Sequence, residues 1–183
     1  MKIKNNIMIY AALLCSILLT SCIKEKLEVT YNRQEDQINS YIESALKKDE
    51  SYTTVRNGGS NRLILKHGEG EELTADGSIT FYYAGYIFKG NITSSGLFAT
   101  NREESANDAN WEVTDPTFEP LTLNLKDSNL LTGLKDGLIG VKGGEDCEII
   151  FSGKYGFGND SFGIIPANSA LLFKIWVISI SNE

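Results

Sequence analysis

The chain has a single histidine, His67, and few basic side chains, and both shortages exclude whole classes of site. One histidine cannot build a His-based metal centre, and no motif supports a Ser-His-acid triad around it. With 17 Lys and Arg against 24 Asp and Glu, the formal net charge is −7. Nucleic-acid binding needs clustered positive charge, so we expect no nucleic-acid partner. We also expect no metal and no cofactor, and we place His67 at the surface end of a strand.

Cysteine is scarce as well, and its three positions carry different meanings. Cys15 lies in the apolar run 7–19, which is short for a bilayer span and follows two lysines, a pattern typical of a secretory signal. The run ends in Leu19-Thr20-Ser21-Cys22, the bacterial lipobox pattern, in which the Cys22 thiol takes the diacylglycerol. The alternative is an ordinary signal peptide with a chance cysteine. We predict a lipoprotein signal peptide over residues 1–21 and lipidation at Cys22.

This prediction fixes several properties of the mature chain. Removing residues 1–21 takes away two lysines and no acid, which moves the formal net charge from −7 to −9. Several acyl chains on Cys22 would hold the protein at a membrane essentially permanently. Ile23, rather than an aspartate, follows the lipidated cysteine, which favours the outer membrane of the cell envelope and leaves the periplasmic and surface faces open. The remaining thiol, Cys147, alternates with Ile149 and Phe151, which predicts a buried structural cysteine rather than a nucleophile.

Residues 22–61 are predicted to form a tether that contains one amphipathic helix. Over residues 32–48, apolar side chains recur at helical spacing, namely at Ile38, Tyr41, Ile42, Ala45 and Leu46. Such a helix could pack on the domain, present a face to a partner, or hold the domain off the membrane, and we favour packing. The composition of residues 57–61, Asn-Gly-Gly-Ser-Asn, predicts a flexible link to the globular domain, which we place at residues 62–183.

The globular domain shows a period of two rather than a helical period. Apolar residues alternate along three runs, which contain Ile79, Phe81, Tyr83 and Ile87, then Leu121, Leu123 and Leu125, then Leu171, Phe173, Ile175 and Val177. Four or five such strands with one short helix over residues 134–141 predict an α+β domain, in which an antiparallel sheet wraps over the helix. The polar segment 101–119 is predicted to be a surface insertion, with Trp111 and Phe118 as residues that could pack it back.

Three motifs in chain order resemble the FKBP-type peptidyl-prolyl cis-trans isomerase family, over about residues 62–180. Tyr155-Gly156-Phe157-Gly158, followed by Ile165-Pro166 and Phe173, is similar to the family's flap and the strand after it. Residues 78–86 look like its first long strand, with a tyrosine on the pocket wall. Residues 130–138, then Gly143-Gly144-Glu145, match its pocket-floor helix and turn. The resemblance implies an FKBP-like fold and an isomerase that acts on proline-containing polypeptides.

Prolyl isomerisation needs none of the missing site types. Its barrier of about 20 kcal/mol comes from amide resonance, and an apolar slot that removes water favours the less dipolar twisted amide. By resemblance, the catalytic slot would use Tyr83, Phe98, Leu131, Phe157, Ile165 and Phe173, and substrate would also meet Leu121, Leu130 and Leu134. The backbone N–H of Leu131 is expected to donate to a substrate carbonyl. For each residue alone, ordinary core packing is the competing explanation.

Departures from the family pattern bear on the rate. Phe98-Ala99 stands where the family has Phe-Asp, so a carboxylate that orients pocket hydroxyls is missing. Phe157 stands where the flap has a tyrosine, and Leu134 replaces a tryptophan at the floor. Each lost hydrogen bond is worth about 0.5 to 1.5 kcal/mol, which predicts a lowered rate. The alternative function is therefore a catalytically weak FKBP-like binding or chaperone module. The sequence leaves the oligomeric state and the client proteins open.

Overall fold

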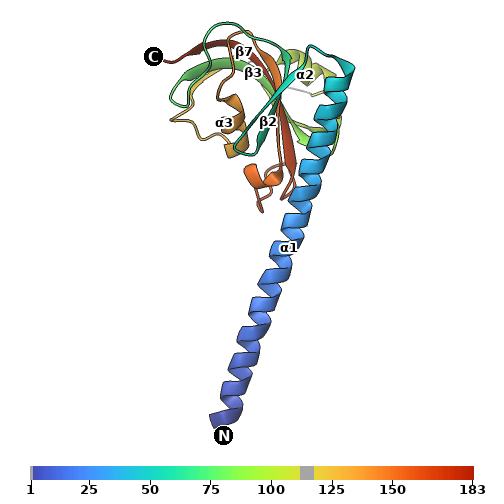
Figure 1. Cartoon of the computed structure of the whole chain (residues 1–183), viewed down its shortest axis with the longest axis vertical. Coiled ribbons are helices and arrows are strands. Elements are labelled where there is room, and N and C mark those ends of the chain that lie inside the picture. The colour runs from blue at the N-terminus through green and yellow to red at the C-terminus, as the bar shows by residue number, and fades with distance from the viewer. Residues whose placement is uncertain (1, 112–117) are drawn as a thin grey trace. The chain divides into compact units, whose positions relative to one another are not determined.

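The computed structural model describes residues 2–111 and 118–183, with side chains from residue 24 onward outside that gap (Figure 1). Its elements in chain order are α1 (Lys2–Lys48), β1 (Thr53–Asn57), β2 (Ser60–Lys66), β3 (Ser78–Phe88), η1 (Ser94–Gly96), β4 (Leu97–Thr100), α2 (Glu103–Asp108), β5 (Leu121–Asn124), α3 (Thr132–Leu138), β6 (Asp146–Phe151), η2 (Gly153–Tyr155) and β7 (Ala170–Ser181). The chain divides into two units, Met1–Arg33 and Gln34–Glu183.

The second unit is built on a single antiparallel sheet. Its seven strands run in the order β1-β2-β6-β7-β3-β4, and β5 pairs with β3 off this path. The long central pair, β3 with β7, extends from Ser78 opposite Ser181 to Phe88 opposite Ala170. The predicted α+β class is confirmed, with more strands in the described part than the four or five expected.

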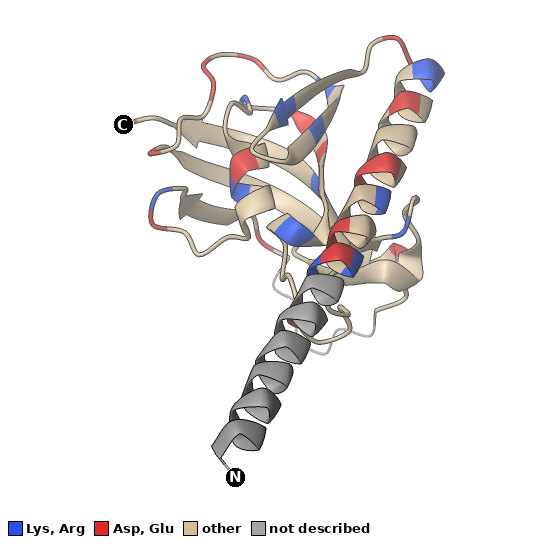
Figure 2. Cartoon of the chain, turned by 60° about the horizontal axis from the view of Figure 1, so that its bottom comes forward, with Lys and Arg blue, Asp and Glu red and all other residues tan. Residues whose placement is uncertain are grey.

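Apolar clusters cover both faces of the sheet. One lies under α3 and includes Phe81, Leu134, Phe151, Leu171 and Phe173. The other lies on the opposite face, where Ile38 and Ile42 of α1 are 0% and 2% exposed among side chains of β2, β3, β6 and β7. The part of α1 from Gln34 onward therefore packs on the sheet, as the helical spacing of its apolar residues favoured. Lys and Arg are interspersed with Asp and Glu along this helix and the loops (Figure 2).

The segment predicted to be a flexible link is instead the turn of a β-hairpin. β1 pairs with β2 in a register that closes at Asn57 opposite Ser60. Gly58 and Gly59 form the turn, with φ angles of +59° and +92°, and two-residue hairpin turns demand such positive angles. The folded unit therefore begins earlier than the predicted boundary at Arg62, because the hairpin and the helix before it belong to it.

The helix under the sheet ends three residues earlier than its predicted end at Val141. α3 spans Thr132–Leu138, and Gly140 has a φ of +84°, a conformation that ends helices and that glycine adopts without steric cost. The predicted signal peptide, residues 1–21, and its lipidated Cys22 lie outside the described side chains, so both stay predictions. Within the part of the chain that the structure describes, no helix has an apolar stretch of the length that a bilayer crossing requires.

Candidate active site

A cavity of about 280 Å³ opens between α3 and the sheet. Its walls are almost entirely apolar, and they consist of Phe81, Tyr83, Phe98, Ala99, Leu121, Asn129, Leu130, Leu131, Leu134, Phe157 and Phe173. All of the predicted pocket residues except Ile165 are in this set. Ile165 is 2% exposed and lies in the core cluster beside the cavity, so its contribution is packing behind the wall.

Aromatic rings fix the shape of one wall. Phe98 meets Phe173 edge to face with ring centroids 5.6 Å apart, and Phe173 stacks on Phe151 at 6.0 Å. Both rings of the first pair lie over Gly85, where an added Cβ would fall 2.7 Å from Phe98 and 2.9 Å from Phe173. The glycine in the Tyr-Ala-Gly step of β3 is thus required by the close approach of the two pocket rings.

Asn101, which the sequence did not single out, holds the β3 strand that carries Tyr83 and Phe81. Its buried side chain accepts a hydrogen bond from the Tyr83 backbone N–H at 2.6 Å and donates to the Phe81 carbonyl at 3.2 Å. It also donates to the carbonyl of Glu119 at 2.9 Å. One side chain therefore fixes the β3 wall and joins both ends of segment 101–119. Nothing in the local pattern marks this residue, because its partners lie 18 to 20 positions away.

Segment 101–119 has structure of its own, including α2. Phe118 shares a hollow with Tyr82 and Trp176 on the sheet, so it packs the segment back as suggested. Trp111 is 38% exposed, and its packing role stays a prediction. Residues 112–117 lie outside the described residues.

Few polar groups face the cavity. Burial raises the pKa of Tyr83, so its phenol stays protonated and can donate a hydrogen bond. No described residue is hydrogen-bonded to that hydroxyl, and Ala99, which lines the same cavity, has no side-chain acceptor. The backbone N–H of Leu131, at the start of α3, has no acceptor among the described residues either. Both groups are therefore available to a substrate carbonyl.

The outer rim of the cavity is an apolar hairpin. Phe157 lines the cavity and stacks on Phe162, with centroids 5.1 Å apart and planes 9° from parallel. Phe162 is paired with Ile165 through two backbone hydrogen bonds across Gly163. Phe162 and Ile164 are 64% and 61% exposed, which extends the apolar surface from the cavity outward.

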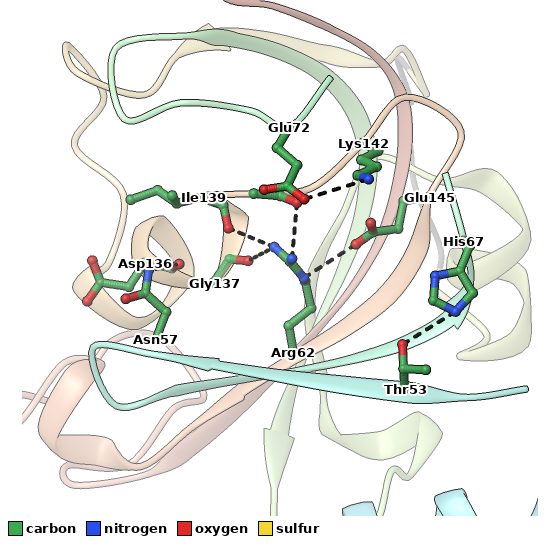
Figure 3. A network of polar contacts seen from close by, with 11 residues as sticks. Thr53, Asn57, Arg62, His67, Glu72, Asp136, Gly137, Ile139, Lys142 and Glu145 are labelled. Carbon is green, nitrogen blue, oxygen red and sulfur yellow. Dashed lines mark hydrogen bonds and ion pairs between the residues drawn. The ribbon is translucent and has the colours of Figure 1, made fainter. Parts of the chain in front are cut away.

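The floor helix is held from below by a buried charge (Figure 3). The Arg62 guanidinium donates to the carbonyls of Gly137, Ile139 and Gly140 at 3.0, 2.8 and 3.1 Å, all at the C-terminal end of α3. A cation suits this end because the helix dipole places negative charge there. Arg62 Nε also lies 3.4 Å from Glu145 Oε1, in an ion pair that is almost fully buried. This network sets the position of Leu134 in the cavity floor.

Other reactive side chains lie elsewhere. Cys147 is buried in β6, and burial raises the pKa of its thiol well above the ordinary value, which is the reverse of what a nucleophile needs. His67 is exposed just after β2, with Nε2 3.4 Å from Thr53 Oγ1. Among the described residues, no three His, Cys, Asp or Glu side chains gather as metal ligands would.

The comparisons agree with this geometry. A family model described as FKBP-type peptidyl-prolyl cis-trans isomerase matches residues 70–178. The chain belongs to this family. By family, then, it is an FKBP-type peptidyl-prolyl cis-trans isomerase, which confirms the enzyme class and fold predicted from its motifs.

Several relatives show how far this FKBP-type isomerase resembles known proteins. FK506-binding protein 1A of Neurospora crassa is 35% identical over 121 residues, which cover 65% of this chain and 86% of that protein. FkpA of Buchnera aphidicola is 27% identical over 158 residues, 86% of this chain and 55% of the relative, so the chain spans about half of that relative's length. The crystal structure of FkpA from Escherichia coli has a TM-score of 0.55 at 18% identity, covering 93% of this chain and 70% of that one. The structural likeness concerns the fold.

Proposed function

We propose that this FKBP-type isomerase catalyses cis-trans isomerisation of X-Pro bonds in exported, partly folded polypeptides, from a lipid anchor at Cys22 in the bacterial outer membrane. The observation that carries the catalytic part is the cavity of about 280 Å³, with phenylalanines on its walls and no charged side chain in its lining. A proline ring would enter this slot and lose water. The Leu131 N–H and the Tyr83 hydroxyl would then donate to substrate carbonyls.

The physical basis is differential binding. The planar amide is more dipolar than the twisted one, so a site that excludes water and offers few dipoles binds the twisted amide better. No covalent step or proton transfer is needed. The residue roles in this proposal, including those of Leu121 and Leu130 at the rim, stay predictions that the rate of isomerisation of a short X-Pro peptide can test.

A second candidate function has its own observation. Ala99 and Phe157 both line the cavity and supply no polar group, while Phe162 and Ile164 expose apolar surface next to it. These features favour a module that binds apolar segments of unfolded chains with little catalysis. The two candidates differ in turnover, not in the place where peptide binds.

A double substitution separates the two functions. Ala99→Asp with Phe157→Tyr adds an acceptor for the free Tyr83 hydroxyl and a second donor in the slot, so kcat/KM should rise about tenfold, equivalent to about 1.4 kcal/mol. Phe157→Tyr alone should gain less, because an unpartnered hydroxyl in an apolar slot loses hydration. Protease-free isomerisation kinetics on an X-Pro peptide would measure both.

The control is the same pair of substitutions in a Tyr83→Phe background, which removes one of the two hydroxyls that the new carboxylate could accept from, so the gain should be smaller. A fully active unmodified protein with no gain in the double variant would mean that the apolar walls alone supply the rate. Two inactive forms that still bind peptide would refute the catalytic proposal and favour the binding module.

The anchoring part of the proposal rests on Leu19-Thr20-Ser21-Cys22. Cys22→Ala should abolish incorporation of labelled fatty acid and move the protein from the membrane fraction to a soluble or uncleaved form. The matched control is Cys15→Ala, which removes a thiol inside the predicted signal and should leave labelling intact. Label retained by Cys22→Ala after metabolic labelling and fractionation would refute the lipidation site.

A further inference from the structure

Residues 153–168, which we call the flap, leave the sheet after β6 and return just before β7. The flap carries Phe157 of the cavity wall, the exposed Phe162 and the buried Ile165. Its two ends touch at Gly153 and Asn168. An added Cβ on Gly153 would lie 2.5 Å from the carbonyl carbon of Asn168, so only glycine allows the ends to come this close. Asn168 itself has a φ of +59°, a left-handed conformation that asparagine tolerates better than most residues.

The side chain of Gln34 connects the two ends of the flap, which we call the flap base. Gln34, in the α1 segment that packs on the sheet, accepts a hydrogen bond from the Gly153 backbone N–H at 2.9 Å. Its amide nitrogen donates to the Asn168 backbone carbonyl at 2.7 Å. The amide group therefore bridges the first and last residues of the flap, as a peptide group of an added strand would.

The site is built to hold this amide in place. Gln34 is 9% exposed, although glutamine is normally found at the surface. Ile38, one helical turn further on, is fully buried in the core cluster on that face of the sheet, together with Ile42. The apolar anchor fixes the helix, and the helix in turn fixes the amide against the flap base.

We infer that Gln34 is a positioning residue for the isomerase: the helix that precedes the catalytic domain sets the geometry of the flap, and thereby of Phe157, through this amide. The inference rests on the proposed function, since it assigns Gln34 a role in that same cavity. It makes the segment from Gln34 to Lys48 part of the catalytic unit rather than a spacer. A purely structural role would require only that the helix contribute to folding.

The Gln34 bridge differs in kind from the hydrogen bonds within the flap. Within it, the Gly158 N–H donates to the Gly153 carbonyl at 3.0 Å and the Asn168 N–H donates to the Gly158 carbonyl. These bonds connect the flap to itself, whereas the Gln34 bonds connect it to a fixed element. Loss of the bridge would leave the Gly153 N–H buried without an acceptor, which costs free energy. The flap base would regain an acceptor by moving toward water.

The test compares three substitutions in the full chain. Gln34→Met keeps the volume and removes both hydrogen bonds. Gln34→Glu, assayed at about pH 8, keeps the acceptor for Gly153 and removes the donor to Asn168. Gln37→Met is the matched control, because Gln37 is an exposed glutamine on the same helix that makes no hydrogen bond with the described residues.

We expect Gln34→Met to lower kcat about three- to tenfold, with a smaller change in KM, which is the range that losing ordinary hydrogen bonds allows. Gln34→Glu would set an ionised carboxylate oxygen against the Asn168 carbonyl oxygen in a buried site, so it should lower kcat at least as much. Gln37→Met should match the unmodified protein. Amide hydrogen exchange at Gly153 should become faster in Gln34→Met, and the NMR signals of Phe157 and Phe162 should move in both Gln34 variants.

Unfolding curves of the same variants distinguish an effect on flap position from an effect on stability. Equal kcat in all folded variants, even with lower stability for Gln34→Met, would overturn the inference and leave Gln34 a structural residue. Failure of Gln34→Met to fold would pass the decision to Gln34→Glu, which keeps the acceptor for Gly153. If the unmodified protein lacks isomerase activity, the proposed function fails. In that case the positioning role is judged by hydrogen exchange and peptide binding, and it is refuted if Gly153 exchange and peptide affinity are unchanged in the Gln34 variants.

Discussion

Replacing Arg62 with methionine is expected to lower the free energy of unfolding by about 3 to 5 kcal/mol at neutral pH, the usual cost of removing one partner of a buried ion pair. Glu145, which is 2% exposed, would keep a buried charge with no counter-ion. The carbonyls of Gly137, Ile139 and Gly140 would also lose the guanidinium that caps α3. Since α3 carries Leu134 into the cavity floor, kcat/KM of the folded fraction should fall too.

The size of this loss should depend on pH in a defined direction. Burial raises the pKa of Glu145, and the charge of Arg62 lowers it in part. The folded state therefore binds this proton more tightly than the unfolded chain, so the carboxylate costs stability above its folded pKa, and the cost disappears as pH falls toward the ordinary value of about 4.5. Without Arg62 the folded pKa rises further. The deficit of Arg62→Met should be largest near about pH 8 and smaller near about pH 5 in urea unfolding.

The double variant Arg62→Met with Glu145→Met is the control for charge. It removes both charges, and apolar replacements of a buried pair are often neutral or stabilising, so it should recover much of the loss despite the uncapped carbonyls. The two paired atoms are 3.4 Å apart and neither makes a hydrogen bond with a described residue, which indicates attraction by charge rather than by a well-aligned hydrogen bond. A double variant as unstable as Arg62→Met would place the cost in the helix cap instead.

The sheet and the cavity could be predicted because their signals are local or ordered along the chain. Alternation of Ile79, Phe81 and Tyr83 predicts one buried face of β3, and the structure places these three side chains in or against the cluster under α3. It does not reveal that the other face of β3 is also buried, at Ala84, Tyr86 and Phe88. The order of three motifs brought together residues as distant as Tyr83 and Phe173, which no periodicity could do. Ile165 shows the limit of this prediction. A motif position predicts that a residue lies near the pocket, but it does not predict whether the side chain lines the cavity or packs behind the residues that do.

The features that the sequence did not predict are mostly long-range polar pairings. Arg62 lies on the same strand face as Ile64, so alternation places it toward the core. A buried arginine implies an acidic partner, but the sequence does not say which Asp or Glu it is. Glu145 is 83 positions away in the chain, and the Gly153 partner of Gln34 is 119 positions away. Residue patterns carry no information on such pairs, because many surface residues of the same types have no long-range polar partner.

The hairpin at Gly58-Gly59 was predictable and was assigned wrongly. Gly-Gly between two short runs of β-forming residues is a strong hairpin signal, and here Thr53-Thr54-Val55 precedes it. Glycine content alone suggested a flexible link. The β1 strand is exposed along its whole length, so it lacks the apolar alternation that would have revealed it. Its pairing with β2 comes from the turn rather than from burial.

The largest effect within the cavity is expected at Phe173. Phe173→Ala should cost about 3 to 5 kcal/mol of unfolding free energy, because the side chain is 6% exposed and its removal leaves a hole between two rings. It should also weaken X-Pro peptide binding and lower kcat/KM, since Phe98 would lose the edge contact that holds it over Gly85. Assays below the unfolding temperature of the variant would measure both effects.

Stability and site geometry can be separated at this position because the chain offers a matched residue. Phe151 stacks on Phe173 and is 0% exposed, yet it does not line the cavity. Phe151→Ala should therefore lose a similar unfolding free energy while its folded fraction keeps most of its peptide affinity. Equal losses of affinity in the two variants, after correction for the folded fraction, would mean that the aromatic stack acts only as core packing. A loss confined to Phe173→Ala would locate the proline ring against the Phe173 face of the cavity.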